Sequence, residues 1–501
     1  MKSVRSILSV NLLTAFTMIA GFASNILLAS LFGLSLKVDA YFAAVVIPSV
    51  TSTLFVTYIG KTFLPIYSSL REKKSSDIDI FVSSVMNIAG IGALLIIAIL
   101  LIFSKPILET ILPGFDEETV NYAQNMLFLM SPSILFISLN NFHGYLWQYE
   151  GKYYRVVIEN LLLPVCIMLS MLVWHEDLKE LSIPLGYIIG RTLGFIILSI
   201  GTPYKYKPGI NTSMPELRSL FQASSVLLST GFIARMRQIV EKSVASTLGE
   251  GSISALAMGN KLCNPIHQGA TIGIRMMAFS KASKLVAKGE VDAAGNLTNS
   301  IARVLLLIMT PVVVLLLFYS SEITAAVFLR GKFNADMHDL VTIALLGLAP
   351  TIIFMSINPI LSNMLFSLET IKVQAWLGPI GTGIYLIAAV TMSQYYGLLG
   401  VALAMSVTTL AQFLILGFFT QRFVSVFDFN GLIVKLLVYV CLALSVLTAM
   451  AKTVAYFTLP VLLEIFLAGV LAGAIYLLLL FILKDKAIMF LWDTFTSKRA
   501  Q

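Results

Sequence analysis

The sequence predicts an all-α polytopic membrane protein. Of its 501 residues, 58% are hydrophobic and only 12% are charged, and the mean hydropathy is +0.89. A soluble chain of this size cannot bury that much apolar surface. Many apolar runs reach about 20 residues, which is enough to cross a bilayer as a helix. Finally, an apolar segment with polar residues at fixed positions occurs twice along the chain, which indicates an internal duplication. We refer to it as the repeated phrase.

Hydropathy predicts about 14 spanning helices. The first apolar run is too long for a signal-peptide core and no clear cleavage site follows it, so we expect an uncleaved first helix. The expected spans are residues 8–32, 40–67, 80–103, 119–147, 155–174, 182–202, 218–247, 253–280, 295–319, 339–367, 371–394, 398–420, 431–451 and 457–483.

Loop charge predicts the orientation of these spans. The loops of one face carry most of the loop lysines and arginines, among them Lys73, Lys74, Lys205 and Lys207. The loops of the other face carry a short set: Lys37, Lys105, Lys179, Arg330, Lys332 and Lys452. Cationic loops stay in the cytoplasm, so both termini are expected there. The net charge of +8 then reflects loops that face an anionic leaflet, and no nucleic-acid partner is expected.

The duplication recurs at three places with a nearly constant offset. SPSILFISLNN at Ser131–Asn141 matches APTIIFMSINP at Ala349–Pro359. ASLFG at 29–33 matches ASTLG at 245–249, and ILPGF at 111–115 matches FLRGKF at 328–333. Chance similarity between apolar helices is the alternative explanation, but three matches at one offset argue against it.

Each repeat covers six spans, so both repeats are expected to insert in the same orientation. They would form two six-helix lobes related by a pseudo-two-fold axis along the membrane normal, as in other parallel-repeat transporters. The predicted division is an N-lobe at 1–210, a C-lobe at 211–424, and spans 13 and 14 with a cytoplasmic tail at 425–501. Two lobes around a shared cleft are typical of a transporter.

Span 7 carries four charges: Arg235, Arg237, Glu241 and Lys242. A charge near the centre of a membrane helix costs about 2.5–3.5 kcal/mol, so these side chains need water, a partner or a ligand. Arg237 and Glu241 are four residues apart and are expected to pair. Arg235 and Lys242 share the other face and have no counter-charge within the helix.

Span 8 adds two cations, Lys261 and Arg275, which lie nearly on one helix face. With Arg235 and Lys242 they predict a cationic wall suited to phosphate oxygens. The alternative is that these side chains extend to the membrane surface and only support the scaffold.

The first lobe is polar but mostly neutral. Ser24 and Asn25 lie in span 1, and Ser52 and Thr57 lie in span 2. They are candidates for contacts with sugar hydroxyls, although hydroxyl-mediated helix packing explains them equally well. Separately, Arg191 in span 6 is expected to form a structural pair with the acidic part of span 5, at Glu159 and Asn160.

Enzyme signatures are missing from the sequence. It has no HExxH, GxSxG or P-loop motif, and its four histidines are scattered. The three cysteines show no CxxC spacing and are expected to be small buried side chains. We therefore expect no catalytic residue, no metal site and no cofactor.

The sequence resembles the MurJ (MviN) branch of the multidrug/oligosaccharidyl-lipid/polysaccharide flippase superfamily. The segments that carry the resemblance are ASLFGLSLKVDAYFAAVVIP at Ala29–Pro48, FLPIYSSLREK at Phe63–Lys73, ISALAMGNKL at Ile253–Leu262 and FLRGKF at Phe328–Phe333. The resemblance covers essentially the whole chain, and the ordered series of segments is more specific than any one of them.

The resemblance implies a flippase for an undecaprenyl-pyrophosphate-linked saccharide, with two six-helix lobes around a cationic central cavity. We expect it to work by alternating access in the bacterial inner membrane, as a monomer. The resemblance also implies that Asp39 matches the family's acid at the start of helix 2, and that Lys261 matches its cavity arginine on helix 8. Glu241 matches an acid implicated in sodium binding, so coupling to Na⁺, H⁺ or the membrane potential is a further expectation.

The chain departs from the family pattern at several positions. Ser24 and Asn25 stand where the family has an Arg-Asp pair, and Ser52, Thr53 and Thr57 replace the charges of helix 2. Asn264 replaces an acid on helix 8 and becomes a neutral candidate for the cavity wall. These losses favour a related polysaccharide precursor, of a capsule, O-unit or exopolysaccharide, over lipid II, and the expected cargo is lipid II or such a precursor. The alternatives are a drug or cation exporter of the same superfamily and a membrane-embedded glycosyltransferase or polymerase.

Overall fold

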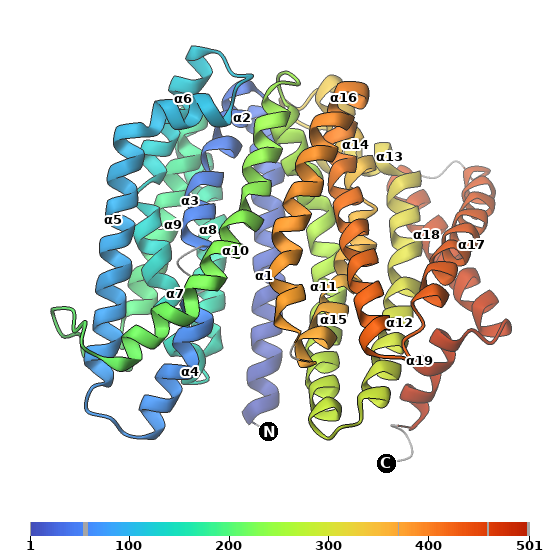
Figure 1. Cartoon of the computed structure of the whole chain (residues 1–501). Helices are drawn as coiled ribbons and strands as arrows, with labels where there is room; N and C mark the ends of the chain where they lie inside the picture. The colour runs from blue at the N-terminus through green and yellow to red at the C-terminus, as the bar shows by residue number, and fades with distance from the viewer. Residues whose placement is uncertain (1, 54–58, 369, 458–459, 498–501) are drawn as a thin grey trace. The chain divides into compact units, whose positions relative to one another are not determined.

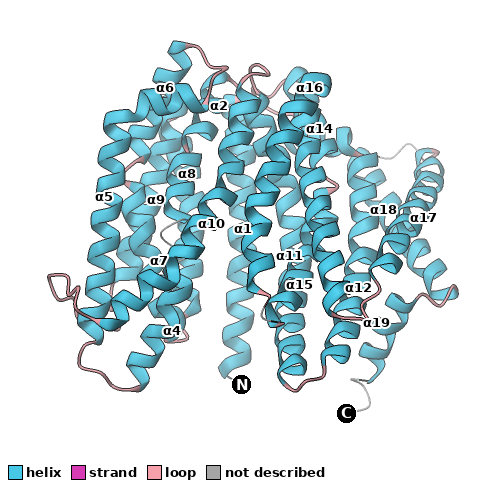
Figure 2. Cartoon of the chain, viewed as in Figure 1, coloured by secondary structure: helices cyan, strands magenta, loops and turns pink. Residues whose placement is uncertain are grey.

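The computed structural model describes residues 2–53, 59–368, 370–457 and 460–497. Within these ranges the regular structure is helical, with no strand (Figures 1 and 2). The chain divides into two compact units. Unit 1 comprises Met1–Ala257 and Arg330–Met337, and unit 2 comprises Met258–Leu329 and His338–Gln501. This division differs from that of the proposed sequence repeat, whose lobe boundaries stay a prediction.

Unit 1 is built around α8, which packs against α1 and α9, while α5 packs against α6 and α7. Its helices are α1 (Lys2–Phe32), α2 (Leu36–Ala44), α3 (Val46–Thr53), α4 (Ile59–Glu72), α5 (Ile78–Ile111), α6 (Glu117–Met130), α7 (Ser133–Tyr149), α8 (Tyr153–Trp174), the short 3₁₀ helix η2 (Lys179–Leu181), α9 (Ser182–Ser199) and α10 (Pro215–Ser246).

Unit 2 is built around α12, which packs against α15 and α17, and α17 in turn packs against α18. Helix α11 (Ser252–Ala287) begins in unit 1 and continues into unit 2. The remaining helices are α12 (Val291–Phe318), α13 (Ser320–Phe328), α14 (Ala335–Leu348), α15 (Thr351–Ser367), α16 (Ile371–Phe423), α17 (Phe429–Ala455), α18 (Val461–Ile482) and α19 (Lys486–Ser497).

Each predicted span coincides with one or more helices, which confirms the helical membrane class. The described residues contain 9 helices long and apolar enough to cross a membrane, or up to 10 if the bent pair α6 and α7 is one span. The number 14 therefore stays a prediction. Helices α10 and α11 are long enough to span, but charges dilute their apolar character. The short helix α13 was not expected from the sequence.

Gly397 separates two expected spans that are otherwise continuous in α16. Its φ of +54° places it in the left-handed region, where a side chain is strained. The sequence predicted a break between residues 394 and 398, and the structure confirms it.

The repeated phrase adopts the same local structure in both copies. In unit 1 a 14-residue helix, α6, is followed by Pro132 at the N-cap of the 17-residue α7. In unit 2 the 14-residue α14 is followed by Pro350 at the N-cap of the 17-residue α15. Proline fits this position because its missing N–H would have no helical partner there. The duplicated sequence thus encodes a duplicated helix break, and the α6–α7 pair is bent by 40° at that break.

The two shorter repeats meet each other within unit 1. Gly114, from the first loop, lies so close to the end of α10 that a Cβ on it would stand 2.0 Å from the Ser246 carbonyl oxygen. Gly331, from the matching loop, is placed so that a Cβ would stand 2.3 Å from the Ser30 carbonyl oxygen, and Lys332 N–H donates to that oxygen at 2.8 Å. Each loop therefore docks on the helix end of the other repeat.

Candidate functional site: charges within the membrane helices

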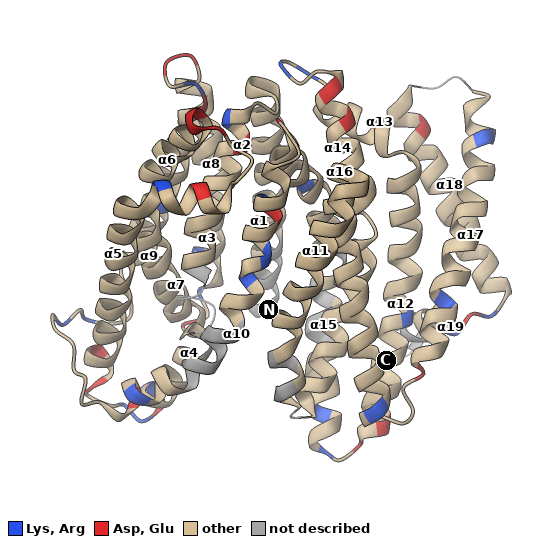
Figure 3. Cartoon of the chain, turned by 45° about the horizontal axis from the view of Figure 1, so that its top comes forward, with Lys and Arg blue, Asp and Glu red and all other residues tan. Residues whose placement is uncertain are grey.

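Charged residues are concentrated toward helix ends and loops, with fewer along the helix middles (Figure 3). This distribution follows from the cost of placing a charge in hydrocarbon. Several of the candidate residues lie within long helices, and their surroundings separate structural charges from candidate binding groups.

Lys242 is paired, contrary to the expectation that its charge was unmatched. Its Nζ lies 2.8 Å from Glu241 Oε1, and their side chains are only 9% and 16% exposed. Glu241 was expected to pair with Arg237, four residues earlier. Adjacent helical residues do not face each other, but both side chains are long and both are largely removed from water, so they turn toward each other. Lys242 is also only four residues from the end of α10.

Asp39 is fully buried, and its carboxylate accepts hydrogen bonds from the start of α11. Gly251 N–H donates to Oδ2 at 2.7 Å, Ser254 N–H donates to Oδ1 at 2.7 Å, and the Ser254 hydroxyl also donates to Oδ1. A carboxylate at a helix N-terminus satisfies donors that have no helical partner and is favoured by the helix dipole. This geometry gives Asp39 a structural role beside the expected role in substrate contact.

The two arginines of α10 lie farther from the helix end. Arg235 and Arg237 are both half-buried, and Arg237 takes part in other interactions within the chain. Both lie more than two helical turns before Ser246, deeper along the helix than Lys242.

Lys261 is exposed on α11, nine residues after Ser252, or about 14 Å along the helix. Within the described part of the chain, no acidic side chain forms an ion pair with it. Asn264, one turn later, is half-buried. The side chain of Arg275, also on α11, lies outside the described residues. Lys261 is therefore a cation in a long helix with no neutralising partner from these ranges.

The neutral candidates lie in two helices. Ser24 is buried on α1, and the Asn25 amide donates to the Gly21 carbonyl of the same helix. Such hydrogen bonds within a helix favour a packing role for Asn25 in this conformation. The side chain of Ser52 and the whole of Thr57 lie outside the described residues.

Glu159 and Arg191 form the expected structural pair, with Arg191 Nη1 at 3.0 Å from Glu159 Oε1. The sequence analysis missed Asn140, whose amide donates to Glu159 Oε1 at 3.3 Å and to the Arg191 carbonyl at 3.2 Å. Asn160, the other expected member, instead donates to the Val156 carbonyl. The signal for Asn140 was available, because it lies in the repeated phrase.

Long apolar helices with a few selectively placed charges define a polytopic helical membrane transport protein, and comparison with known proteins makes this more specific. The family model described as "Lipid II flippase MurJ" matches residues 28–476. The chain therefore belongs to the MurJ family of lipid II flippases.

Relatives and solved structures agree with this assignment. A probable lipid II flippase MurJ from Thermotoga maritima is 24% identical over 85% of this chain and 87% of its own. A structure of a lipid II flippase MurJ in an inward closed conformation has a TM-score of 0.80 and 22% identity, covering 94% of this chain and 98% of that one. An inward-facing MATE-family multidrug transporter of the MOP superfamily has a TM-score of 0.66 and 12% identity, with coverages of 81% and 95%. The two structural matches indicate a shared fold.

Proposed function

We propose that this protein moves an undecaprenyl-pyrophosphate-linked saccharide, lipid II or a related cell-envelope precursor, from the cytoplasmic to the outer leaflet of the bacterial inner membrane. It acts as a transporter rather than an enzyme, with both termini in the cytoplasm. The observation that carries the proposal is the family match across residues 28–476, combined with a cation of α11, Lys261, that has no ion-pair partner among the described residues.

The diphosphate of the cargo is proposed to contact Arg235, Arg237, Lys261 and Arg275. Lysine and arginine form strong charge-assisted hydrogen bonds with phosphate oxygens. Lys242 is left out of this contact set because the Glu241 carboxylate already neutralises it. Asp39 is left out because its carboxylate has the same sign of charge as the diphosphate and already accepts three hydrogen bonds. The isoprenoid tail stays in the bilayer while the head group crosses.

Alternating access requires contacts that close one face of the protein, and the reciprocal glycine contacts fit that role. Gly114 and Gly331 hold loops of opposite repeats against Ser246 and Ser30. In the proposed topology these loops face the outside, so their separation would accompany release of the cargo there.

Glu241 is the remaining candidate for cation coupling. Its carboxylate is engaged by Lys242, so a sodium ion or a proton would have to compete with that lysine. Outward movement of a diphosphate is also sensitive to the membrane potential, at about 2.3 kcal/mol per charge per 100 mV.

The drug or cation exporter is the weaker alternative. A cationic substrate needs an accessible carboxylate within the membrane. The three acidic candidates are already engaged: Asp39 accepts backbone hydrogen bonds, and Glu159 and Glu241 each form an ion pair.

Complementation of a flippase-depleted bacterial strain tests the proposal. Lys261→Ala is expected to abolish growth at normal protein level, because the diphosphate loses its counter-charge, while Lys261→Arg is expected to support growth. Lys452→Ala is the matched control, since Lys452 is an exposed lysine in the last turn of α17. Wild-type growth of Lys261→Ala would contradict the proposed role.

A further inference from the structure

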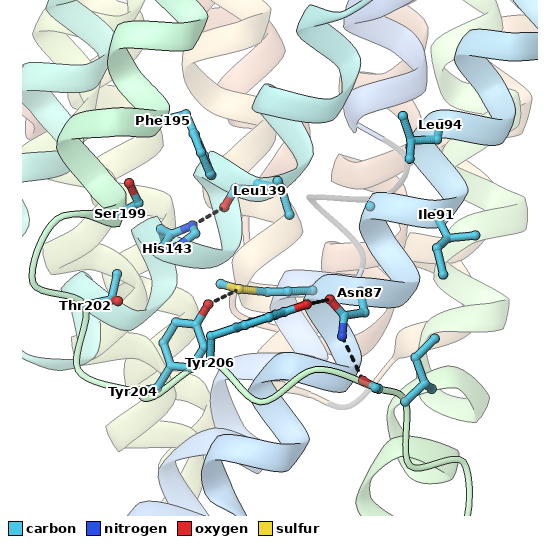
Figure 4. Close-up of a pocket in the computed structure, with 14 residues that line it drawn as sticks. Asn87, Ile91, Leu94, Leu139, His143, Phe195, Ser199, Thr202, Tyr204 and Tyr206 are labelled. Carbon is cyan, nitrogen blue, oxygen red and sulfur yellow. Dashed lines mark hydrogen bonds between the residues drawn. The ribbon is translucent and has the colours of Figure 1, made fainter.

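A cavity of about 810 Å³ lies within unit 1, and none of the charged residues discussed above lines it. Helices α5, α7 and α9 and the loop of residues 200–214 line it, and we refer to it as the α5–α9 pocket (Figure 4). Its volume falls in the range of about 300–1,000 Å³ typical of ligand pockets.

The α5–α9 pocket changes from polar to apolar along the helix axis. Asn87, Tyr204 and Tyr206 line it beside the loop, whereas Ile91 and Leu94 line it farther along α5. From Asn87 to Leu94 the helix rises about 10 Å. Ile91 and Leu94 are 50% and 54% exposed, and in a spanning helix such side chains face the acyl chains of the bilayer. The pocket therefore opens toward lipid at its apolar end and toward the membrane surface at its polar end.

The polar end has a fixed structure. Asp79, Ser83 and Asn87 lie on one face of α5, four residues apart, and each binds the loop. Lys205 N–H donates to Asp79 Oδ1 at 3.1 Å, Lys207 N–H donates to Ser83 Oγ at 2.9 Å, and Asn87 Nδ2 donates to the Gly209 carbonyl at 2.8 Å.

Side chains of the pocket are also fixed in place. The Tyr206 hydroxyl donates to Asn87 Oδ1 at 2.9 Å, as the dashed line in Figure 4 shows. His143 Nδ1 lies 2.9 Å from the Leu139 carbonyl, which can only accept, so Nδ1 carries the proton. The other ring nitrogen, Nε2, is then an acceptor suited to a hydroxyl group of a ligand. Tyrosines at this depth are typical of the membrane interface.

The loop that lines the pocket also carries exposed cations. Lys205 and Lys207 are exposed on the loop, and Arg155 binds the Ile200 carbonyl at the end of α9 through Nη1 at 2.6 Å. The acidic group beside them is Asp79, which already accepts the Lys205 N–H. Basic side chains at the membrane surface attract anionic head groups by about 1 kcal/mol each.

Gly90 keeps the apolar end open. A Cβ there would meet only Leu135 Cδ1, at 3.8 Å, an ordinary contact distance. Glycine in a helix interior costs about 1 kcal/mol relative to alanine, yet local packing does not require it at this position. A glycine here leaves space on the side of α5 that faces Leu135 of α7.

We infer that the α5–α9 pocket is a binding site for an anionic diacyl phospholipid with a hydroxyl-bearing head group, of the phosphatidylglycerol kind. An acyl chain lies along Gly90, Ile91 and Leu94, the head-group hydroxyls reach His143, and the phosphate is held by Lys205 and Lys207. This site goes beyond the proposed transport function, since the bound lipid would be a resident of the bilayer and not the cargo.

Native mass spectrometry of the purified full-length protein, exchanged against dioleoyl phosphatidylglycerol or dioleoyl phosphatidylcholine, tests the site. The wild type is expected to retain one phosphatidylglycerol at least tenfold more strongly than phosphatidylcholine. Gly90→Phe is expected to lose that lipid by filling the apolar end. Gly383→Phe is the matched control, because Gly383 is an exposed glycine of α16 with no neighbour within 4 Å of its Cβ position.

A second variant separates the head group from the chain and does not depend on the folding of Gly90→Phe. Lys205→Gln with Lys207→Gln should weaken phosphatidylglycerol retention by about fivefold per lysine and leave phosphatidylcholine unchanged. Equal retention of the two lipids by the wild type, or unchanged retention in Gly90→Phe, would overturn the inference. So would preferential retention of a prenyl diphosphate, or displacement of the lipid by soluble glycerol phosphate. The readout is lipid retention, so it stands apart from the transport test.

Discussion

The two copies of the repeated phrase share a frame and differ in charge. Asn140 in α7 donates to the Arg191 carbonyl at 3.2 Å, and Asn358 in α15 donates to the Thr409 carbonyl at 3.0 Å. The donors are 218 residues apart (140 to 358), and so are the acceptors (191 to 409). Both copies therefore fix one helix to another through the same amide-to-carbonyl bond.

The side chains around that bond have diverged. In unit 1 the acceptor residue is Arg191, whose side chain pairs with Glu159. In unit 2 it is Thr409, whose hydroxyl donates to the Met405 carbonyl of its own helix at 3.1 Å. The comparison teaches that backbone acceptors maintain the duplicated architecture, whereas side-chain charge at the same place was free to change.

The largest effect should come from breaking the ion pair of unit 1. Glu159→Ala leaves Arg191 as an unpaired charge in the membrane, and loss of one partner of a buried pair costs about 3–5 kcal/mol. Thermal unfolding in detergent should show a large decrease in Tm. Thr409→Val is the control in unit 2 and is expected to have little effect. Similar losses for the two variants would refute the proposed difference between the copies.

Next in size is the change at the reciprocal glycines. Gly331→Ala is expected to cost about 1–3 kcal/mol from overpacking against Ser30 and about 1–2 kcal/mol more from its φ of +62°. Gly114→Ala should incur only the overpacking cost against Ser246. Differential scanning fluorimetry of both variants measures the contrast, and a greater loss for Gly114→Ala would mean that the backbone conformation of Gly331 is not the cause.

Removing the shared amide should have a smaller effect, and one that differs between the units. Asn140→Ala removes a hydrogen bond to a charged group and should cost about 1.5–3 kcal/mol, whereas Asn358→Ala removes a neutral one and should cost about 0.5–1.5 kcal/mol. The two Tm values provide the test. In a Glu159→Ala background, the decrease in Tm caused by Asn140→Ala should become smaller and approach the decrease caused by Asn358→Ala. If it does not, the two residues act independently.

The smallest effect concerns an ion pair outside the repeats, at the end of α18. Burial alone would raise the pKa of the Asp485 carboxyl, but hydrogen bonds from Lys435, the Ala487 N–H and Tyr439 outweigh it and hold that pKa below its ordinary value. A depressed folded-state pKa stabilises the protein above the unfolded value of about 3.9, and this contribution is lost as pH falls through the folded value.

The Tm difference between wild type and Asp485→Asn should therefore be constant from about pH 7 to pH 5 and should narrow below about pH 4. Lys484→Gln, at the neighbouring exposed position, is the control. A difference that grows in acid would reverse the sign and exclude this account.

Much of the fold could be predicted from the sequence because membrane helices are encoded locally. Apolar runs located the helices, and the break between residues 394 and 398, in the middle of α16, was correctly predicted. The repeat was visible because it preserves Pro132 and Pro350, which start helices. The Glu159–Arg191 pair was predicted because a lone anion and a lone cation in neighbouring spans have few other partners.

The candidate site was harder to predict because its contacts are not local. The rule for i,i+4 pairs assigned Glu241 to Arg237, but side-chain length allowed the adjacent Lys242 to reach it. Asp39 accepts hydrogen bonds from Gly251 and Ser254, which are more than 200 residues away in the sequence, and no local sequence pattern predicts such a contact. The α5–α9 pocket depends on the loop of residues 200–214, whose polar composition is the same as that of an ordinary solvent-exposed loop.

The docking of Gly114 and Gly331 has a consequence for how the sequence can vary. Each glycine touches a carbonyl of the main chain, an atom that every amino acid supplies. Substitutions at Ser30 therefore leave the touching oxygen in place. At Ser246 they also leave it in place, but they remove the hydroxyl that accepts the Gly114 N–H at 3.2 Å. The contacts between the two repeats can therefore tolerate many substitutions of neighbouring side chains, provided that positions 114 and 331 stay glycine.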